Sequence, residues 1–226
     1  SILAIRMAAR AGKAGLPITP SDVFQLQTIE RLAELAGALR PRQRRGADRV
    51  FPAALLPEAA AGQEPAPACL IASLVLDAHI GAVELALAVH RLADRHDALR
   101  LRWVRDGQAS HVEIAAYVGR LPIRMVEVPG LPDARIDAWV AEHAARIARG
   151  LDTGSGVTLA TTLVDRGPVT PPVVVVALHP GIADYTGAML LLNELQTALA
   201  SGAAALPALD DTPTYADWLD WRENHA

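Results

Sequence analysis

The sequence HPGIADY, residues 179–185, places a histidine and an aspartate directly after an apolar run at residues 173–178. Such a run is typical of a buried strand. Histidine transfers protons near neutral pH, so His179 and Asp184 are our candidate catalytic residues. A single histidine after a buried strand is more often a structural residue, and that interpretation of His179 stays open beside the catalytic one.

Ser1 opens an apolar, helix-compatible stretch that contains Ile2, Ile5, Met7 and Ala9. A serine at a helix N-terminus is exposed, and the positive end of the helix dipole favours a phosphate on its hydroxyl. From its position alone, Ser1 is the residue that caps this helix.

The remaining potential metal ligands show no spacing typical of a metal site. Cys69 is the only cysteine, which excludes an intrachain disulfide and a cysteine-rich zinc site. We predict no metal site, and the cysteine usage fits a reducing cytoplasm. The histidines without metal-site spacing are His79, His90, His96, His111, His143 and His225.

Charge and hydropathy argue against two classes of partner. The formal net charge is -4 and is spread along the 226 residues, whereas nucleic-acid binding needs a concentrated basic face. The one basic cluster, residues 40–45, lies between periodic segments and fits a solvated linker. No apolar stretch approaches the ~20 residues that span a bilayer. We predict neither nucleic acid nor membrane as a partner.

Residues 1–38 predict a helix, a proline-bearing loop, a short turn and a second helix. The prolines at the loop cannot continue a helix because they lack an amide hydrogen and restrict the preceding residue. Ser21 or Asp22 is expected to cap the short turn, and Thr28 the second helix.

Prolines and glycines punctuate residues 39–67 too often for a long helix or a central strand. We predict a linker there, in which Val50, Phe51, Leu55 and Leu56 pack on a neighbouring element.

Residues 68–226 alternate between strand and helix patterns, which predicts a mixed α/β layer structure. We expect strands at residues 69–76, 99–104, 111–114, 123–128, 157–164 and 173–178, and helices at residues 83–94, 136–150, 189–199 and 215–221.

The sequences SILAIR (residues 1–6) and ITPSDVFQLQTI (residues 18–29) resemble the C-terminal part of a peptidyl carrier protein. In that family the serine that opens the helix carries 4'-phosphopantetheine. The resemblance implies that Ser1 holds this cofactor, which would carry a peptidyl or aminoacyl thioester. The sequence begins at Ser1, after the point where the family has Gly-Gly-Asp and without a methionine, which leads us to expect a segment of a longer polypeptide.

The HPGIADY sequence resembles the His-His-x-x-x-Asp-Gly motif of the condensation and epimerisation domains of nonribosomal peptide synthetases. Two further sequences support the resemblance: RHDALR at residues 95–100 and the proline-rich stretch with a Tyr-x-x-Trp helix at residues 206–221. The resemblance implies a chloramphenicol-acetyltransferase-like fold, an α/β lobe with a mixed sheet and packed helices. Residues 68–226 would be the N-terminal lobe of a two-lobed domain, preceded by a partial carrier-protein helical bundle.

The sequence departs from that motif at the position of the second histidine, which carries out proton transfer. Pro180 stands where the family keeps its proton-transfer histidine, and proline has no titratable group. His179 matches the first histidine, whose implied role is to support the loop.

Asp184 matches the family's structural aspartate, and we expect Arg100 or Arg102 to pair with it. Tyr185 replaces a glycine, and we expect its side chain to narrow the substrate tunnel.

Taken together, the resemblances imply part of a nonribosomal peptide synthetase whose condensation-type domain has lost catalysis and acts in docking. Its expected partners are a carrier-bound thioester, neighbouring synthetase domains and a recruited tailoring enzyme. Two alternatives stay open. One is an active, atypical condensation or epimerisation domain, and the other is a structural spacer.

Overall fold

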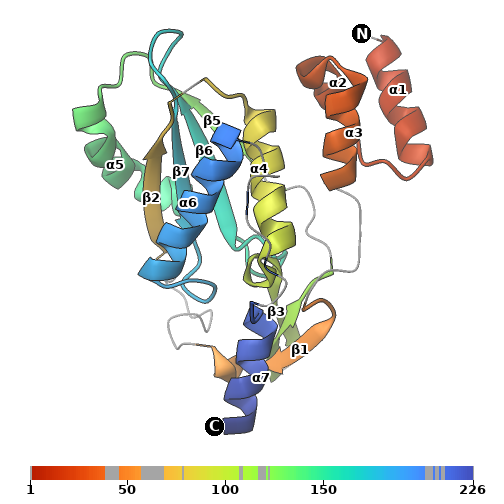
Figure 1. The fold of residues 1–226 in the computed structure, drawn as a ribbon, viewed down its shortest axis with the longest axis vertical. Coiled ribbons are helices and arrows are strands. Elements are labelled where there is room, and N and C mark those ends of the chain that lie inside the picture. Colours follow the sequence, from red (N-terminus) through yellow and green to blue (C-terminus); the bar gives the residue numbers. More distant parts are fainter. Residues whose placement is uncertain are drawn as a thin grey trace.

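The computed structural model describes residues 2–38, 46–56, 69–77, 79–106, 109–116, 121, 123–201, 206, 209 and 212–225. Figure 1 shows a helical unit at the N-terminus (residues 2–38) beside a larger α/β lobe, formed by the described residues from 46 to 225. Ser1 lies outside the described residues. No described helix is both long enough and apolar enough to cross a membrane.

The predicted mixed α/β fold is confirmed. The helices are α1 (Ile2–Lys13), α2 (Pro20–Leu26), α3 (Ile29–Ala38), α4 (Ala82–Arg95), α5 (Ile136–Ala148), α6 (Tyr185–Ser201) and α7 (Tyr215–His225). The strands are β1 (Arg49–Pro52), β2 (Leu70–Val75), β3 (Leu101–Asp106), β4 (Ala109–Ile114), β5 (Ile123–Glu127), β6 (Leu159–Asp165) and β7 (Val173–Leu178). Short 3-10 turns are η1 (Ala53–Leu55), η3 (Asp97–Arg100) and η4 (Asp133–Arg135).

Side-chain caps define the helices of the helical unit. Thr19, rather than the predicted Ser21 or Asp22, caps α2: its hydroxyl accepts a hydrogen bond from the Asp22 amide, and the Asp22 carboxylate accepts one from the Thr19 amide at 2.7 Å. This reciprocal pair satisfies two amides that a helix start leaves without partners. The predicted cap of α3 is present, because the Thr28 hydroxyl accepts from the Arg31 amide at 3.3 Å.

The helical unit packs on α4 through a small apolar cluster. Leu26, Leu32 and Leu35 are buried there against Val83, and Leu87 lies partly buried at the edge. The contact removes apolar surface of both units from water, and this burial stabilises the contact.

The larger sheet has the strand order β2-β7-β6-β5, in which β5 and β6 are parallel and the other neighbours are antiparallel. Every residue of β7 is buried. Alternate residues explain why: Val174 and Val176 face the core with α4 and α6, while Val173 and Val175 face α5. A strand covered on both faces needs a continuous apolar run, so the chain that leads to His179 is held on both sides.

The second sheet is antiparallel, with the order β1-β4-β3. Its edge strand β1 lies inside the segment predicted to be a linker, residues 39–67, so residues 49–52 are part of the lobe. Pro52 sits at the end of an edge strand, where a missing amide donor is tolerated. Phe51, Leu55 and Leu56 are buried as predicted, whereas Val50 is exposed.

Candidate functional site

His179 lies at the carboxyl end of β7 and is buried, with 4% of its surface exposed. Its amide donates to the Thr158 carbonyl at 2.9 Å, and its carbonyl accepts from the Ile182 amide at 3.1 Å. The ring lies edge-on to Trp103, with 4.9 Å between ring centroids. The backbone of His179 is therefore held by Thr158 and by the turn, and its ring by Trp103 of the second sheet.

The hydrogen bonds of the His179 ring determine which nitrogen carries the proton. The Gly181 amide donates to Nδ1 at 3.2 Å, so Nδ1 is the acceptor and the neutral ring carries its proton on Nε2. Burial lowers the pKa of His179 below its ordinary value, which keeps the ring neutral at pH 7. In this state the imidazole can donate a hydrogen bond from Nε2, but neither nitrogen is free to accept a proton from a substrate.

Asp184 is exposed and serves as the N-terminal cap of α6, where its Oδ1 accepts from the Gly187 amide at 2.8 Å. The predicted arginine partner is wrong: among the residues that the structure describes, no arginine pairs with Asp184. A carboxylate at a helix start is stabilised by the local amides and by the helix dipole, so it needs no cation.

The two arginines predicted as partners have other roles. Arg100 is buried and donates to three carbonyls, those of Ala93 at 2.6 Å, Asp94 at 3.3 Å and Ala115 at 3.0 Å. Arg102 forms an ion pair with Glu113 across the β3–β4 pair. Arg100 thus satisfies carbonyls at the end of α4, where cations are favoured.

Two residues differ from the family motif, Pro180 and Tyr185. Pro180 follows His179 without an amide donor or a titratable group. Tyr185 has 73% of its surface exposed at the start of α6. The expected narrowing of a substrate tunnel by Tyr185 stays a prediction, because that tunnel would lie between this lobe and a second one.

The RHDALR segment joins three helices. Arg95 and His96 at the end of α4 both bind the Glu194 carboxylate of α6, at 3.0 Å and 2.6 Å. Asp97 is buried and accepts from the backbone amides at the start of α7. Glu194 and the α7 amides were not predicted as partners, because no local sequence pattern connects segments about a hundred residues apart.

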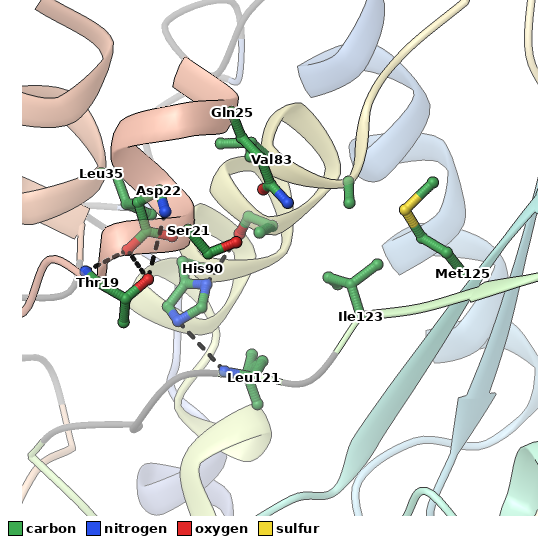
Figure 2. A pocket seen from close by; sticks show the side chains of 12 residues that line it. Thr19, Ser21, Asp22, Gln25, Leu35, Val83, His90, Leu121, Ile123 and Met125 are labelled. Carbon is green, nitrogen blue, oxygen red and sulfur yellow. Dashed lines mark hydrogen bonds between the residues drawn. The ribbon is translucent and has the colours of Figure 1, made fainter. Parts of the chain in front are cut away.

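A cavity of about 460 Å³ lies between the helical unit and the lobe, and it was not predicted from the sequence. Figure 2 shows Ser21 and Gln25 of α2 on one side, His90 of α4 in the middle and Met125 of β5 on the other. His90 donates from Nδ1 to the Ala86 carbonyl at 2.8 Å and accepts from the Leu121 amide at 3.5 Å. The His90 ring is thus engaged by the backbone, and neither His179 nor Asp184 lines this cavity.

The last two candidate sites are those for the cofactor and for a metal ion. Ser1, the predicted attachment site of phosphopantetheine, is outside the described residues. Within the described ranges no group of three or more histidine, cysteine, aspartate or glutamate side chains is placed to hold a metal ion.

Comparison with known proteins shows what this arrangement is similar to. The chain is 28% identical over 234 residues to one subunit of the linear gramicidin synthase of Brevibacillus parabrevis, an alignment that covers all of this chain and 4% of that protein. A condensation domain from the enacyloxin polyketide synthase is 22% identical, with a TM-score of 0.58 over 92% of this chain and 42% of that chain. The chain has a condensation-type fold.

The chain is also similar in fold to a solved complex of the X-domain and OxyB from teicoplanin biosynthesis, with 21% identity and a TM-score of 0.57 over 81% of this chain and 39% of that one. None of the established family profiles matches the chain. The chain thus spans less than half the length of each of these two solved chains.

Proposed function

We propose that this chain is part of a nonribosomal peptide synthetase in which a carrier unit, residues 1–38, precedes a condensation-type lobe that has lost catalysis. In this proposal the lobe holds a carrier-bound peptidyl or aminoacyl thioester, or a tailoring enzyme, while neighbouring domains perform the chemistry. The alignment with the gramicidin synthase supports it, because that alignment includes the helical unit as well as the lobe.

The observation that carries the proposal is the state of His179 beside Pro180. General base catalysis needs a titratable group with a free lone pair within reach of the reacting proton. The Nδ1 lone pair of His179 is occupied by the Gly181 amide, and the adjacent Pro180 offers no replacement. Protonating Nδ1 would break that hydrogen bond and place a charge in a buried site, so the loop resists the step that catalysis requires.

A docking role also accounts for apolar side chains that the fold leaves in contact with solvent. The first half of α6, directly after the His179 loop, exposes Tyr185, Met189 and Leu190 by 73%, 47% and 63%. Exposed apolar clusters of this kind mark protein-interaction sites. The solved complex of the teicoplanin X-domain with OxyB offers a precedent for a condensation-type fold that binds an enzyme.

The decisive experiment is an assay on the intact synthetase with its carrier loaded. We expect neither amide-bond formation with an acceptor carrier nor exchange of the α-proton of the bound residue for deuterium above background. His179→Ala should leave both readings unchanged. Turnover that disappears in His179→Ala would instead make His179 the catalytic base and favour the active, atypical domain.

A further inference from the structure

Three segments far apart in the sequence meet at the start of α7. The Asp97 carboxylate, which is buried, accepts from the Tyr215 amide at 2.8 Å through Oδ1 and from the Ala216 amide at 2.9 Å through Oδ2. A carboxylate that satisfies the first amides of a helix fixes both the position and the direction of that helix start. The RHDALR segment thereby determines where the Tyr215 side chain lies.

Tyr215 then reaches the loop that contains His179. Its hydroxyl donates to the Gly181 carbonyl at 2.6 Å. The same peptide unit, between Gly181 and Ile182, donates its amide hydrogen to the His179 carbonyl at 3.1 Å. Because both ends of this peptide are bonded, its orientation is fixed, and the bonds reinforce each other in a low-dielectric site.

The preceding peptide, between Pro180 and Gly181, completes the connection. The Gly181 amide donates to Nδ1 of His179 and so selects the ring's tautomer. A glycine released from Tyr215 would rotate about its own φ and ψ with little hindrance. Its amide would then leave Nδ1.

We infer that Tyr215 is a positioning residue for the loop at residues 179–185, and that α7 links the RHDALR segment to His179. The inference deepens the proposed function by identifying what maintains that loop, and it concerns the loop whether or not the lobe is catalytic. The hydroxyl is suited to the role because burial raises the pKa of Tyr215 well above its ordinary value, despite the opposing charge of Arg222. It therefore remains a donor at any physiological pH.

The competing explanation is that Tyr215 only packs in the core. Its ring does contact Trp218, with 5.2 Å between centroids. Packing needs the ring, whereas positioning needs the hydroxyl, so Tyr215→Phe separates the two. Tyr185→Phe is the matched control, because it removes a hydroxyl from an exposed ring in the same loop.

The test is a pH titration of the His179 ring by NMR in the full chain, without substrate or cofactor, with the signal assigned through His179→Gln. In the unmodified chain we expect the Nε2-protonated tautomer and a pKa below about 6.5. In Tyr215→Phe the pKa should rise by about half a unit or more and the tautomer preference should weaken, because Nδ1 loses its donor. Tyr185→Phe should titrate like the unmodified chain.

An unchanged His179 titration in a folded Tyr215→Phe chain overturns the inference. If that variant does not fold, Asp97→Asn provides the same test, since the amide can accept only through its single oxygen and leaves one α7 amide without a partner. A smaller shift in the same direction is expected for Asp97→Asn, and no shift overturns the inference. Because no turnover is measured, an active enzyme would refute the proposed function and leave this result standing.

Discussion

His179 combines a buried ring with an occupied Nδ1, and the two features have one thermodynamic consequence. Burial lowers the pKa of His179 in the folded protein, while the unfolded chain retains the ordinary value near 6.5. Between these values the unfolded state binds more protons than the folded state, so the free energy of unfolding falls as the pH falls. The contribution of neutral His179 to the free energy of unfolding is fully present above the unfolded pKa. It is lost as the pH falls through the lower pKa of the folded state.

The substitution His179→Gln should therefore flatten the pH dependence of stability. We expect urea unfolding to show a smaller loss of stability between pH 7.5 and pH 5.5 in this variant than in the unmodified chain. His79→Gln is the control, because it makes the same substitution at an exposed position. Equal slopes for His179→Gln and the unmodified chain would show that His179 does not resist protonation.

Asp184 illustrates how exposure changes the expected cost of a substitution. Loss of a buried ion pair costs about 3–5 kcal/mol, whereas loss of an exposed helix cap costs about 0.5–2 kcal/mol. Since Asp184 caps α6 at the surface, Asp184→Ala should fall in the lower range. Asp184→Asn keeps the capping oxygen and should be close to neutral, so an equally large loss in both variants would indicate a need for the charge. Denaturant unfolding measures both.

We predict that Ser1 is the residue to which the cofactor is attached. In the intact synthetase, a phosphopantetheinyl transferase with coenzyme A should add one 4'-phosphopantetheine arm to the carrier unit, as measured by mass spectrometry. Ser1→Ala should abolish the addition, while Ser21→Ala, which removes a hydroxyl elsewhere in the same unit, should not. An arm that persists in Ser1→Ala would remove the assignment.

Among the elements, α7 depends on two carboxylates that differ in burial. Asp97 is buried and bonds two amides from another segment, whereas Asp217 lies exposed within the helix and bonds Thr214 and Arg49. A buried amide that loses its acceptor has no water to replace it, and the cost is about 1–3 kcal/mol. An exposed amide that loses its acceptor can bond to water instead, so the cost is smaller.

Asp97→Ala should therefore destabilise the lobe by about 1–3 kcal/mol, and Asp217→Ala by less than about 1 kcal/mol. Chemical unfolding followed by tryptophan fluorescence measures the difference, since Trp218 and Trp221 lie on α7. Equal losses for the two variants would mean that α7 is held by its apolar contacts and not by the Asp97 cap.

At the scale of the whole molecule, the contact between the helical unit and the lobe is small. Among the described residues it consists of the apolar cluster around Val83 and Leu35, with an ion pair between Arg31 and Glu84 at 3.1 Å. That pair is about half exposed, so it contributes about 0–1 kcal/mol and the apolar cluster dominates. Two cavities beside the contact are lined by residues of both units.

Val83→Asp should loosen the helical unit without unfolding the lobe. The described members of this cluster are all apolar and offer a carboxylate no hydrogen-bond donor from their side chains. We therefore expect the free energy of opening of the α3 amides to fall by about 1–3 kcal/mol in hydrogen exchange, with β7 unchanged. Ile29→Asp on the exposed side of α3 is the control. Unchanged exchange in α3 after Val83→Asp would show that the helical unit is stable without this contact.

Local patterns in the sequence were sufficient for most of the elements. The period of apolar residues predicted α4, α5 and the run of β7, and Thr28 was correctly identified as a helix cap, because these features depend on neighbours within a few residues. The strand β1 was missed because its pairing with β4 is about sixty residues away in sequence, and the prolines of the surrounding segment, residues 39–67, are typical of a loop.

For the candidate site, the sequence alone determined which chemical groups are present: a histidine, a proline in place of a second histidine, and an aspartate five residues after His179. Only the tertiary structure decided their states. Asp184 accepts a hydrogen bond from an amide at the start of α6 instead of pairing with an arginine. Arg100 donates hydrogen bonds to carbonyls at the end of α4. The link from Asp97 through Tyr215 to the His179 loop spans separations of 118 and 34 residues. Such contacts arise when separate elements pack together, and the pattern within any one element does not encode which neighbour it will meet.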